Sequence, residues 1–183
     1  MASAVLFGGS FDPPHIGHME IVKRLKELDF VDRVVIMPTY LNPFKRSFTA
    51  PPHKRLEWLR KIFENDPKVS VSDFEVRQNQ RVPTIESVLE LKKHYDKVYV
   101  AIGADNLADL AKWHRYDKLK KEAKFIVFTR GDENLPNGEY YVVPLEIPVS
   151  STQLRKNIQK ELLPEKVADE IYNYYKEHNE RTH

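Results

Sequence analysis

The segment that most restricts the fold of this chain runs from Gly8 to His18 and reads Gly-Gly-Ser-Phe-Asp-Pro-Pro-His-Ile-Gly-His. It follows a short apolar run at residues 4–7, which predicts a buried strand. The two glycines let the backbone turn tightly and approach a ligand closely. A helix that begins within the segment would direct free N–H groups and a partial positive charge at a bound anion. The order of strand, glycine turn and helix therefore predicts a site for the phosphates of a nucleotide.

Two histidines, His15 and His18, lie at the predicted helix start and share one of its faces because they are three residues apart. Both can donate hydrogen bonds to phosphate oxygens, and a phosphate beside them would raise their pKa. Either alone could be a helix cap or a surface residue, but their joint position favours phosphate binding. Phe11 is either a core residue or a ligand contact, and Asp12 is either a turn former or a catalyst.

Length and charge limit the class of protein. The 183 residues fit one domain over 1–183, with a C-terminal helical part at about 150–178 packed on it. Lysine and arginine total 29 against 27 acidic residues, which disfavours a nucleic-acid partner. The chain has no cysteine, so it has no disulfide or thiolate site. We see no signal peptide and no run of about 20 apolar residues for a membrane span. We therefore expect a cytoplasmic protein without a membrane partner.

Apolar runs rich in β-branched residues alternate with helical patterns along the chain. Strands are expected near residues 5–7, 34–37, 69–71, 98–102, 125–128 and 140–143, and helices near 16–28, 53–65, 84–94, 105–110, 116–122 and 165–176, with another starting at Ser150 or Ser151. Thr84 and Asp105 are expected to cap their helices, and residues 72–83 to be irregular. Continuously apolar strands separated by helices predict a doubly wound α/β fold with a mainly parallel sheet. Its ligands would bind beyond the carboxyl ends of the strands.

Two signatures far apart in the chain resemble those of the nucleotidylyltransferase superfamily. Gly9–His18 is similar to its phosphate-binding motif, and Ser150–Arg155 is similar to its second motif, a serine- and threonine-rich helix start followed by arginine. The middle of the chain, at Gly103–Leu107 and Trp113–Tyr116, resembles the bacterial nicotinate-nucleotide adenylyltransferase family. The resemblance spans nearly the whole chain and implies the Rossmann-like fold of these nucleotidylyltransferases.

Two departures from that family fall in one part of the chain. The family usually carries Pro-Pro-His-Lys where this chain has Asn42-Pro43-Phe44-Lys45, which keeps the lysine and loses the histidine. It often has Ser-Tyr-Thr where residues 82–84 read Val-Pro-Thr. Both changes concern the mononucleotide pocket and leave the adenylate end unchanged.

The resemblance implies transfer of AMP from ATP to nicotinate mononucleotide, giving deamido-NAD and pyrophosphate in NAD biosynthesis. The nucleophile arrives with the substrate, so the protein must mainly align and neutralise phosphates. The residues assigned to ATP are Gly8, Gly9, Ser10, Phe11, His15, His18, Gly103, Asp105, Ser151, Thr152 and Arg155. His15, His18 and Arg155 are the expected catalytic groups, with His18 the first choice for stabilising the transition state. Mg²⁺ is expected on the ATP phosphates, with no dedicated protein metal site.

For the mononucleotide, the resemblance assigns Lys45, Thr84, Trp113 and His114. Trp113 would stack on the pyridine ring, or it belongs to the core. Backbone N–H groups near Thr84 and His114 would meet the nicotinate carboxylate and favour it over an amide. Lys45 is either a phosphate contact or a solvated loop residue, and Arg130 is a weaker candidate on the ATP side.

Three alternatives remain at this point. The acceptor could be nicotinamide mononucleotide or phosphopantetheine, or the protein could be a non-catalytic nucleotide sensor. The presence of His15, His18, Thr152 and Arg155 disfavours a sensor. We interpret the lysine-rich run at 118–124 as a solvated helix face and the C-terminal tyrosines at 172, 174 and 175 as packing residues.

Overall fold

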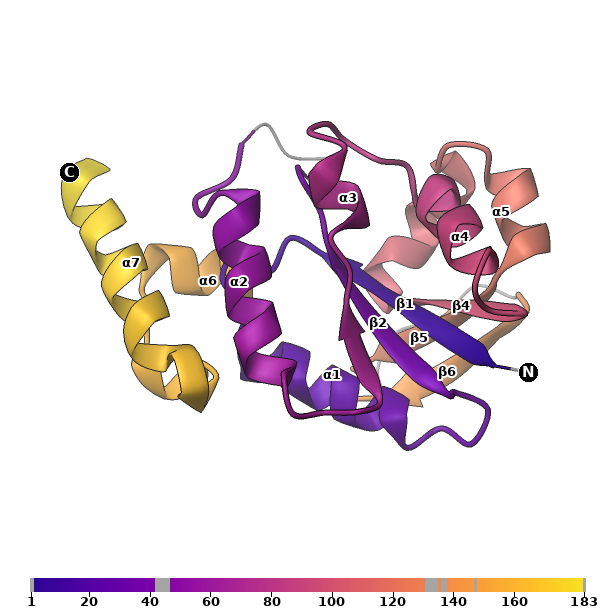
Figure 1. Ribbon diagram of the computed structural model, residues 1–183, viewed down its shortest axis with the longest axis horizontal. Helices are drawn as coiled ribbons and strands as arrows, with labels where there is room; N and C mark the ends of the chain where they lie inside the picture. Colours follow the sequence, from indigo (N-terminus) through magenta and orange to yellow (C-terminus); the bar gives the residue numbers. More distant parts are fainter. Residues whose placement is uncertain (1, 42–46, 131–134, 136–137, 147, 183) are drawn as a thin grey trace.

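The computed structural model describes residues 2–41, 47–130, 135, 138–146 and 148–182. Its described strands form one sheet in the order β3-β2-β1-β4-β5-β6, and every neighbouring pair is parallel (Figure 1). The strands are β1 Ser3–Gly9, β2 Arg33–Pro38, β3 Val69–Val71, β4 Lys97–Gly103, β5 Lys124–Thr129 and β6 Tyr140–Pro144. The strand order reverses beside β1, which is the defining feature of a doubly wound fold. The predicted fold class is confirmed.

Helices cover both faces of the sheet (Figure 1). They are α1 Ile16–Lys26, α2 Pro52–Phe63, α3 Phe74–Arg77, α4 Thr84–Lys92, α5 Tyr116–Glu122, α6 Ser151–Lys156 and α7 Ala168–Thr182. Three 3₁₀ segments accompany them: η1 Ala104–Lys112, η2 Lys160–Leu162 and η3 Glu165–Val167.

Alternation along β1 divides the apolar side chains between two cores. Val5 and Phe7 join a core that also takes residues from α1, α2, α6 and α7. Ala4 and Leu6 point to the opposite face, where they meet side chains of α4, α5 and η1. Because successive strand residues face opposite sides, a continuously apolar strand fills both layers at once. The helical C-terminus lies beyond α2, with Trp58 of α2 against Tyr175 of α7 at 6.0 Å between ring centroids (Figure 1).

The helix starts differ from expectation at two places. Thr84 is the first residue of α4 and Pro83 is its N-cap, so the Thr84 hydroxyl does not cap the helix. Asp105 lies inside η1, whose N-cap is Gly103. In both cases a residue one or two positions earlier in the chain has the extended backbone of a cap, which places the predicted cap within the first turn.

Residues 72–83 are not wholly irregular, because they contain the single turn α3. Asp73 holds it: its carbonyl accepts from the Arg77 N–H at 2.9 Å, and its carboxylate pairs with the Arg77 side chain at 2.9 Å. A four-residue helix is too short to show an apolar period. Throughout the described ranges, no helix has the length and apolar character needed to cross a bilayer. The cytoplasmic location stays a prediction.

Candidate active site

His15 and His18 together close the N-terminus of α1. His15 is the N-cap, and its Nδ1 accepts from the Gly17 N–H at 3.0 Å. The His18 Nδ1 accepts in turn from the His15 N–H at 3.1 Å, which completes a capping box. The two rings stack with their centroids 3.7 Å apart. Helix capping and phosphate binding are therefore compatible, because each imidazole uses only one of its two ring nitrogens for the cap.

The free protein holds both histidines in the neutral form. Burial lowers the pKa of His15 to about 4. Burial and, to a smaller extent, the charge of His15 hold the pKa of His18 well below its usual range. An imidazole nitrogen that accepts a hydrogen bond carries no proton, so each ring has its N–H on Nε2. Each ring is thus oriented to donate one hydrogen bond from the side opposite its cap.

The tight turn of the motif falls at Phe11 and not at the glycines. Gly8 and Gly9 still belong to β1, whereas Phe11 has a left-handed backbone with φ 51°. The Phe11 side chain is 1% exposed, and its ring lies 4.7 Å from that of His18 and 5.3 Å from that of Phe7. Its ring therefore supports His18 from the core. A Cβ on Gly9 would lie 3.4 Å from the same ring, which is ordinary van der Waals contact.

Asp12 lies in a bend of the chain, which agrees with a turn former, and its side chain is also a buried junction. Its carboxylate accepts from the N–H groups of Thr49 at 2.7 Å and Ala50 at 2.9 Å, and from the hydroxyl of Tyr175. Its side chain is engaged by three donors and 3% of the residue is exposed. Tyr175 of α7 thus does more than pack, because it ties the C-terminal helix to the phosphate-binding motif.

Arg55 of α2 is a second buried junction, and the sequence interpretation missed it. Only 1% of it is exposed, and burial lowers its pKa. Its guanidinium donates to four carbonyls, those of Ser10, Thr39, Tyr40 and Ala50, at 2.6–3.0 Å. It therefore fixes the segment after β1 against the segment after β2. Its position in phase with Trp58, Leu59 and Ile62 was the available sequence signal.

The C-terminal signature lies directly against the N-terminal one. The Ser151 hydroxyl donates to the Pro13 carbonyl at 2.8 Å, and the Arg155 guanidinium donates to the Asp12 carbonyl at 2.7 Å. Arg155 also donates to the Thr152 hydroxyl at 3.2 Å. The N-cap of α6 is Ser150, which leaves Ser151 for the contact between motifs. The histidines and the arginine therefore belong to one region of the molecule.

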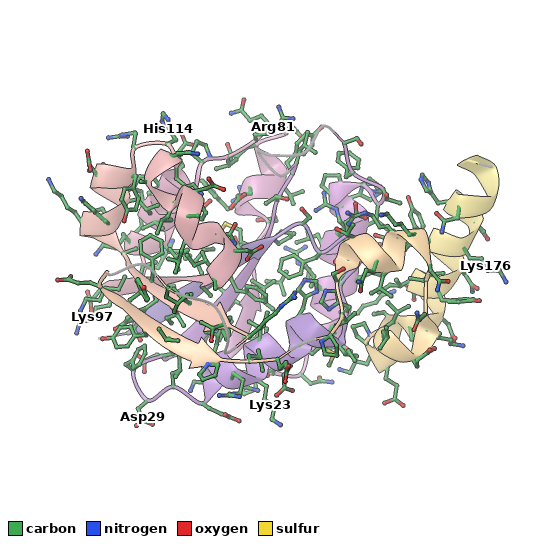
Figure 2. All side chains as sticks on the ribbon, turned by 180° about the vertical axis from the view of Figure 1, so that it is seen from behind. Lys23, Asp29, Arg81, Lys97, His114 and Lys176 are labelled. Atoms are coloured by element: carbon green, nitrogen blue, oxygen red, sulfur yellow. The ribbon has the colours of Figure 1, made fainter. Side chains whose placement is uncertain are left out.

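A cavity of about 460 Å³ lies beside this region, at the carboxyl ends of β1, β4 and β5. This is the position expected for a ligand in a doubly wound fold, and the volume suits a small-molecule site. Its lining includes six residues predicted or quoted from the sequence: Gly8, Gly9, Gly103, Thr84, Trp113 and His114. Figure 2 shows two residues of this lining, Arg81 and His114, along the same edge of the molecule.

The remaining predicted residues lie at the margins of the cavity or outside the described chain. Asp105 is exposed, and its Oδ1 packs so closely over Gly103 that a Cβ there would lie 2.6 Å away. Its neighbour Asn106 lines the cavity in its place. Arg130 follows β5 and is exposed. Lys45 lies outside the described residues.

Trp113 lies between the cavity and the core. It lines the cavity and also packs against the core on the α4 and α5 side of the sheet. The next residues, His114 and Arg115, are exposed, and Arg115 has a left-handed backbone with φ 54°. Left-handed residues other than glycine cost energy and often occur at functional sites.

Two buried polar groups of the cavity were not predicted as parts of the site. Glu75 of α3 is buried, and its Oε2 lies 2.7 Å from the Ser87 hydroxyl of α4. Burial raises the pKa of Glu75 to about 7, against the opposing effect of the Ser87 hydrogen bond. Thr39, at the end of β2, has a buried hydroxyl with no hydrogen-bond partner in the structure. Both lie in segments that follow strands.

The fold and this site define a nucleotidylyltransferase of the cytidylyltransferase-like class, and the sequence model of that class matches residues 6–157. A protein of Sulfurimonas denitrificans named "Probable nicotinate-nucleotide adenylyltransferase" is 51% identical over the full length of both chains. A protein of the same name from Nitratiruptor is 49% identical, with 93% of this chain and 97% of that chain covered. This chain belongs to the nicotinate-nucleotide adenylyltransferase family.

A solved structure supports the fold independently. The nicotinic acid mononucleotide adenylyltransferase of Plasmodium falciparum, complexed with NaAD, superposes with a TM-score of 0.76 at 22% sequence identity. The alignment covers 98% of this chain and 97% of that one. The two chains therefore share their architecture from end to end.

Proposed function

We propose that this protein transfers the adenylyl group of ATP to nicotinate mononucleotide and releases pyrophosphate. The observation that carries the proposal is the contact between the two motifs, Ser151 with Pro13 and Arg155 with Asp12, next to a cavity at the carboxyl end of the sheet. Family membership supports the same reaction. An attack by the acceptor phosphate on the α-phosphorus of ATP requires alignment and charge neutralisation and no covalent enzyme intermediate.

In this proposal His15, His18, Thr152 and Arg155 bind the triphosphate. The two Nε2–H groups donate to phosphate oxygens, and the guanidinium supplies a fixed charge with several donors. Triphosphate binding would raise the pKa of both histidines, so charge would develop where the leaving pyrophosphate needs it. The N-terminus of α1 adds the favourable end of a helix dipole. Gly8, Gly9, Ser10 and Gly103 allow the nucleotide to approach the backbone.

The acceptor occupies the cavity. Trp113 stacks on the pyridine ring, and backbone N–H groups at Thr84 and His114 bind the nicotinate carboxylate. Thr84 suits this role because it is the first residue of α4 and no described side chain caps that helix. The backbone N–H groups of a first helical turn have no acceptor within the helix. Lys45 is assigned to the acceptor phosphate by resemblance.

Mg²⁺ enters this reaction as part of the ATP substrate. Among the described residues, no three acidic or histidine side chains gather in a way that could hold a metal ion. The Asp12 carboxylate already accepts from three donors. We therefore assign Mg²⁺ to phosphate oxygens and water, which is the usual state of this ion on nucleotides.

A panel of acceptors tests the proposal. Purified protein with ATP and Mg²⁺ is supplied with nicotinate mononucleotide, nicotinamide mononucleotide or phosphopantetheine, and pyrophosphate release is measured. We expect the highest kcat/KM with nicotinate mononucleotide. Efficient turnover of phosphopantetheine with no turnover of nicotinate mononucleotide would overturn the assignment, and nucleotide binding without turnover of any acceptor would indicate a sensor.

A further inference from the structure

Glu75 is a buried acid in the wall of the acceptor cavity. It belongs to α3, only 6% of it is exposed, and it lines the cavity together with Thr84, Trp113 and His114. Its carboxyl group is fixed by the fully buried Ser87 at 2.7 Å. Ser87 lies three residues after Thr84 in α4, which is about one helical turn, or about 5 Å, from the start of that helix. The Glu75 carboxyl group is therefore held close to the place proposed for the nicotinate carboxylate.

An acid at this place has opposite effects in its two protonation states. As a carboxylate, Glu75 would repel the carboxylate of nicotinate mononucleotide within a poorly solvated cavity. As a neutral acid it would remove the repulsion and could donate a hydrogen bond. The amide of nicotinamide mononucleotide has the reverse preference, because its NH₂ group donates to a carboxylate.

The surroundings of Glu75 favour the neutral state near neutral pH. Its pKa is raised to about 7 chiefly by burial. The charged or titratable side chains that share the cavity wall with it are Arg81, Lys112 and His114. Among the described lining residues, Glu75 is the one carboxylic acid. Its ionisation is therefore the one that places a negative charge beside the ligand.

We propose that Glu75 is a specificity-determining residue: as a neutral acid it admits the nicotinate carboxylate, and as a carboxylate it favours the nicotinamide amide. The inference rests on the proposed function and deepens it. It predicts that the choice between the acid and the amide substrate depends on pH. The deciding quantity is the ratio of kcat/KM for nicotinate mononucleotide to kcat/KM for nicotinamide mononucleotide.

The ratio is measured from about pH 6 to about pH 8 at saturating ATP and Mg²⁺. Titration of His15, of His18 or of the acceptor phosphate affects both substrates and cancels in the ratio, whereas an effect of His114, which shares the cavity wall, would persist in Glu75→Gln. We expect the ratio of the wild-type protein to fall at least about tenfold over this range, because the neutral fraction of Glu75 falls about tenfold while the carboxylate fraction, which favours the amide, rises. The Glu75→Gln variant stays neutral and should keep a constant ratio. Glu86→Gln is the matched control, because Glu86 is exposed and adjacent to Ser87 in α4, and it should follow the wild type.

Each outcome decides the inference. A constant ratio in an active wild-type protein, or the same fall in Glu75→Gln, would overturn the role of Glu75 and leave the proposed function intact. Absence of turnover with both mononucleotides would overturn the proposed function and this inference with it. If Glu75→Gln does not fold, the pH profile of the ratio is measured in His114→Asn. A fall that persists there supports Glu75, and a fall that disappears assigns the effect to His114 and overturns the inference.

Discussion

The two ends of the site are built in contrasting ways. At the triphosphate end, side chains from α2, α6 and α7 hydrogen-bond to the segment Ser10–Pro13, and two imidazoles cap α1. At the acceptor end, a cavity of about 460 Å³ is lined by strand residues with a few polar groups between them. In the proposed function, the cross-linked network fixes charges for a phosphate chain, whereas the cavity is proposed to select a ring and its substituent by shape, stacking and one buried acid.

The two ends also respond to protons in opposite directions. His15 and His18 have lowered pKa values, so acid charges groups that the folded triphosphate end holds neutral. Glu75 has a raised pKa, so alkali charges a group that the folded acceptor end holds neutral. Burial is the first cause in all three, and the sign differs because the charged form of histidine is protonated while that of glutamate is not.

The largest expected loss of stability follows from Asp12→Ala, which breaks the network of the triphosphate end. It leaves two backbone N–H groups and the Tyr175 hydroxyl without their acceptor, and removes a charge that favours buried Arg55. We expect the free energy of unfolding to fall by about 3–5 kcal/mol. Urea unfolding measures it. Asp73→Ala, which removes ion pairs at the surface, should cost less than about 1 kcal/mol, and an equal loss in both variants would contradict the network.

His18→Ala separates capping from catalysis. Loss of an Nε2–H donor to the triphosphate should lower kcat by about 10²–10³-fold. The variant should also lose about 0.5–2 kcal/mol of stability, because His18 accepts from the His15 N–H. His18→Gln restores the acceptor of the capping box without the imidazole. Steady-state kinetics should therefore show low turnover in both variants, and recovery of turnover in His18→Gln would assign His18 to the helix cap alone.

The opposite titrations give a pH dependence of stability with a defined sign. His15 has a pKa of 6.5 in the unfolded chain and about 4 in the folded protein. Between these values the unfolded chain binds the proton more tightly, so stability falls as the pH is lowered from 6.5 to about 4. Glu75 has a pKa of 4.5 in the unfolded chain and about 7 in the folded protein. Its contribution to stability therefore falls as the pH rises from 4.5 to about 7. Each contributes about 3 kcal/mol over its window. The two windows overlap between about pH 4.5 and 6.5, so the opposite slopes offset each other there in the wild-type protein. Urea unfolding at several pH values should therefore show a more negative pH slope of stability in His15→Asn and a more positive slope in Glu75→Gln; slopes equal to that of the wild type would contradict the pKa assignments.

Tyr175→Phe is the mildest test of the contrast. It removes one hydrogen bond to a buried carboxylate and leaves the ring in place, so we expect a loss of about 1.5–3 kcal/mol. KM for ATP should rise while KM for the acceptor mononucleotide stays constant, because the contact supports only the triphosphate end. Tyr172→Phe, on the same helix, should leave both constants unchanged. Equal effects on both substrates would show that α7 stabilises the fold without distinguishing the two ends.

The fold was predictable because its signal is local. Continuous apolar runs such as Val98–Ile102 predicted buried parallel strands, and the structure places β4 at Lys97–Gly103. The helix caps were less predictable, since Thr84 and Asp105 have the right chemistry one or two residues too late in the chain. Pro83 is the N-cap of α4 and Gly103 is the N-cap of η1. Which residue takes the cap position depends in each case on the path of the chain before the helix.

The site was predictable where spacing carried it. His15 and His18 share a helix face by simple geometry, and the second signature directed attention to Arg155. Arg55 and Glu75 escaped because a charged residue is ordinarily assigned to solvent, and only the packed structure shows that these two are buried. The apolar period of α2 indicated that Arg55 faces the core, whereas the four-residue α3 is too short for such a period to indicate that Glu75 is buried.

The central claim is that the imidazoles near one end of the chain and the guanidinium near the other bind a single triphosphate. A crystal structure of the protein with a non-hydrolysable ATP analogue tests it directly. We predict phosphate oxygens within hydrogen-bond distance of Nε2 of His15 or His18 and of the Arg155 guanidinium in the same complex. A triphosphate that contacts only one of these groups, or that lies elsewhere on the molecule, would contradict the account.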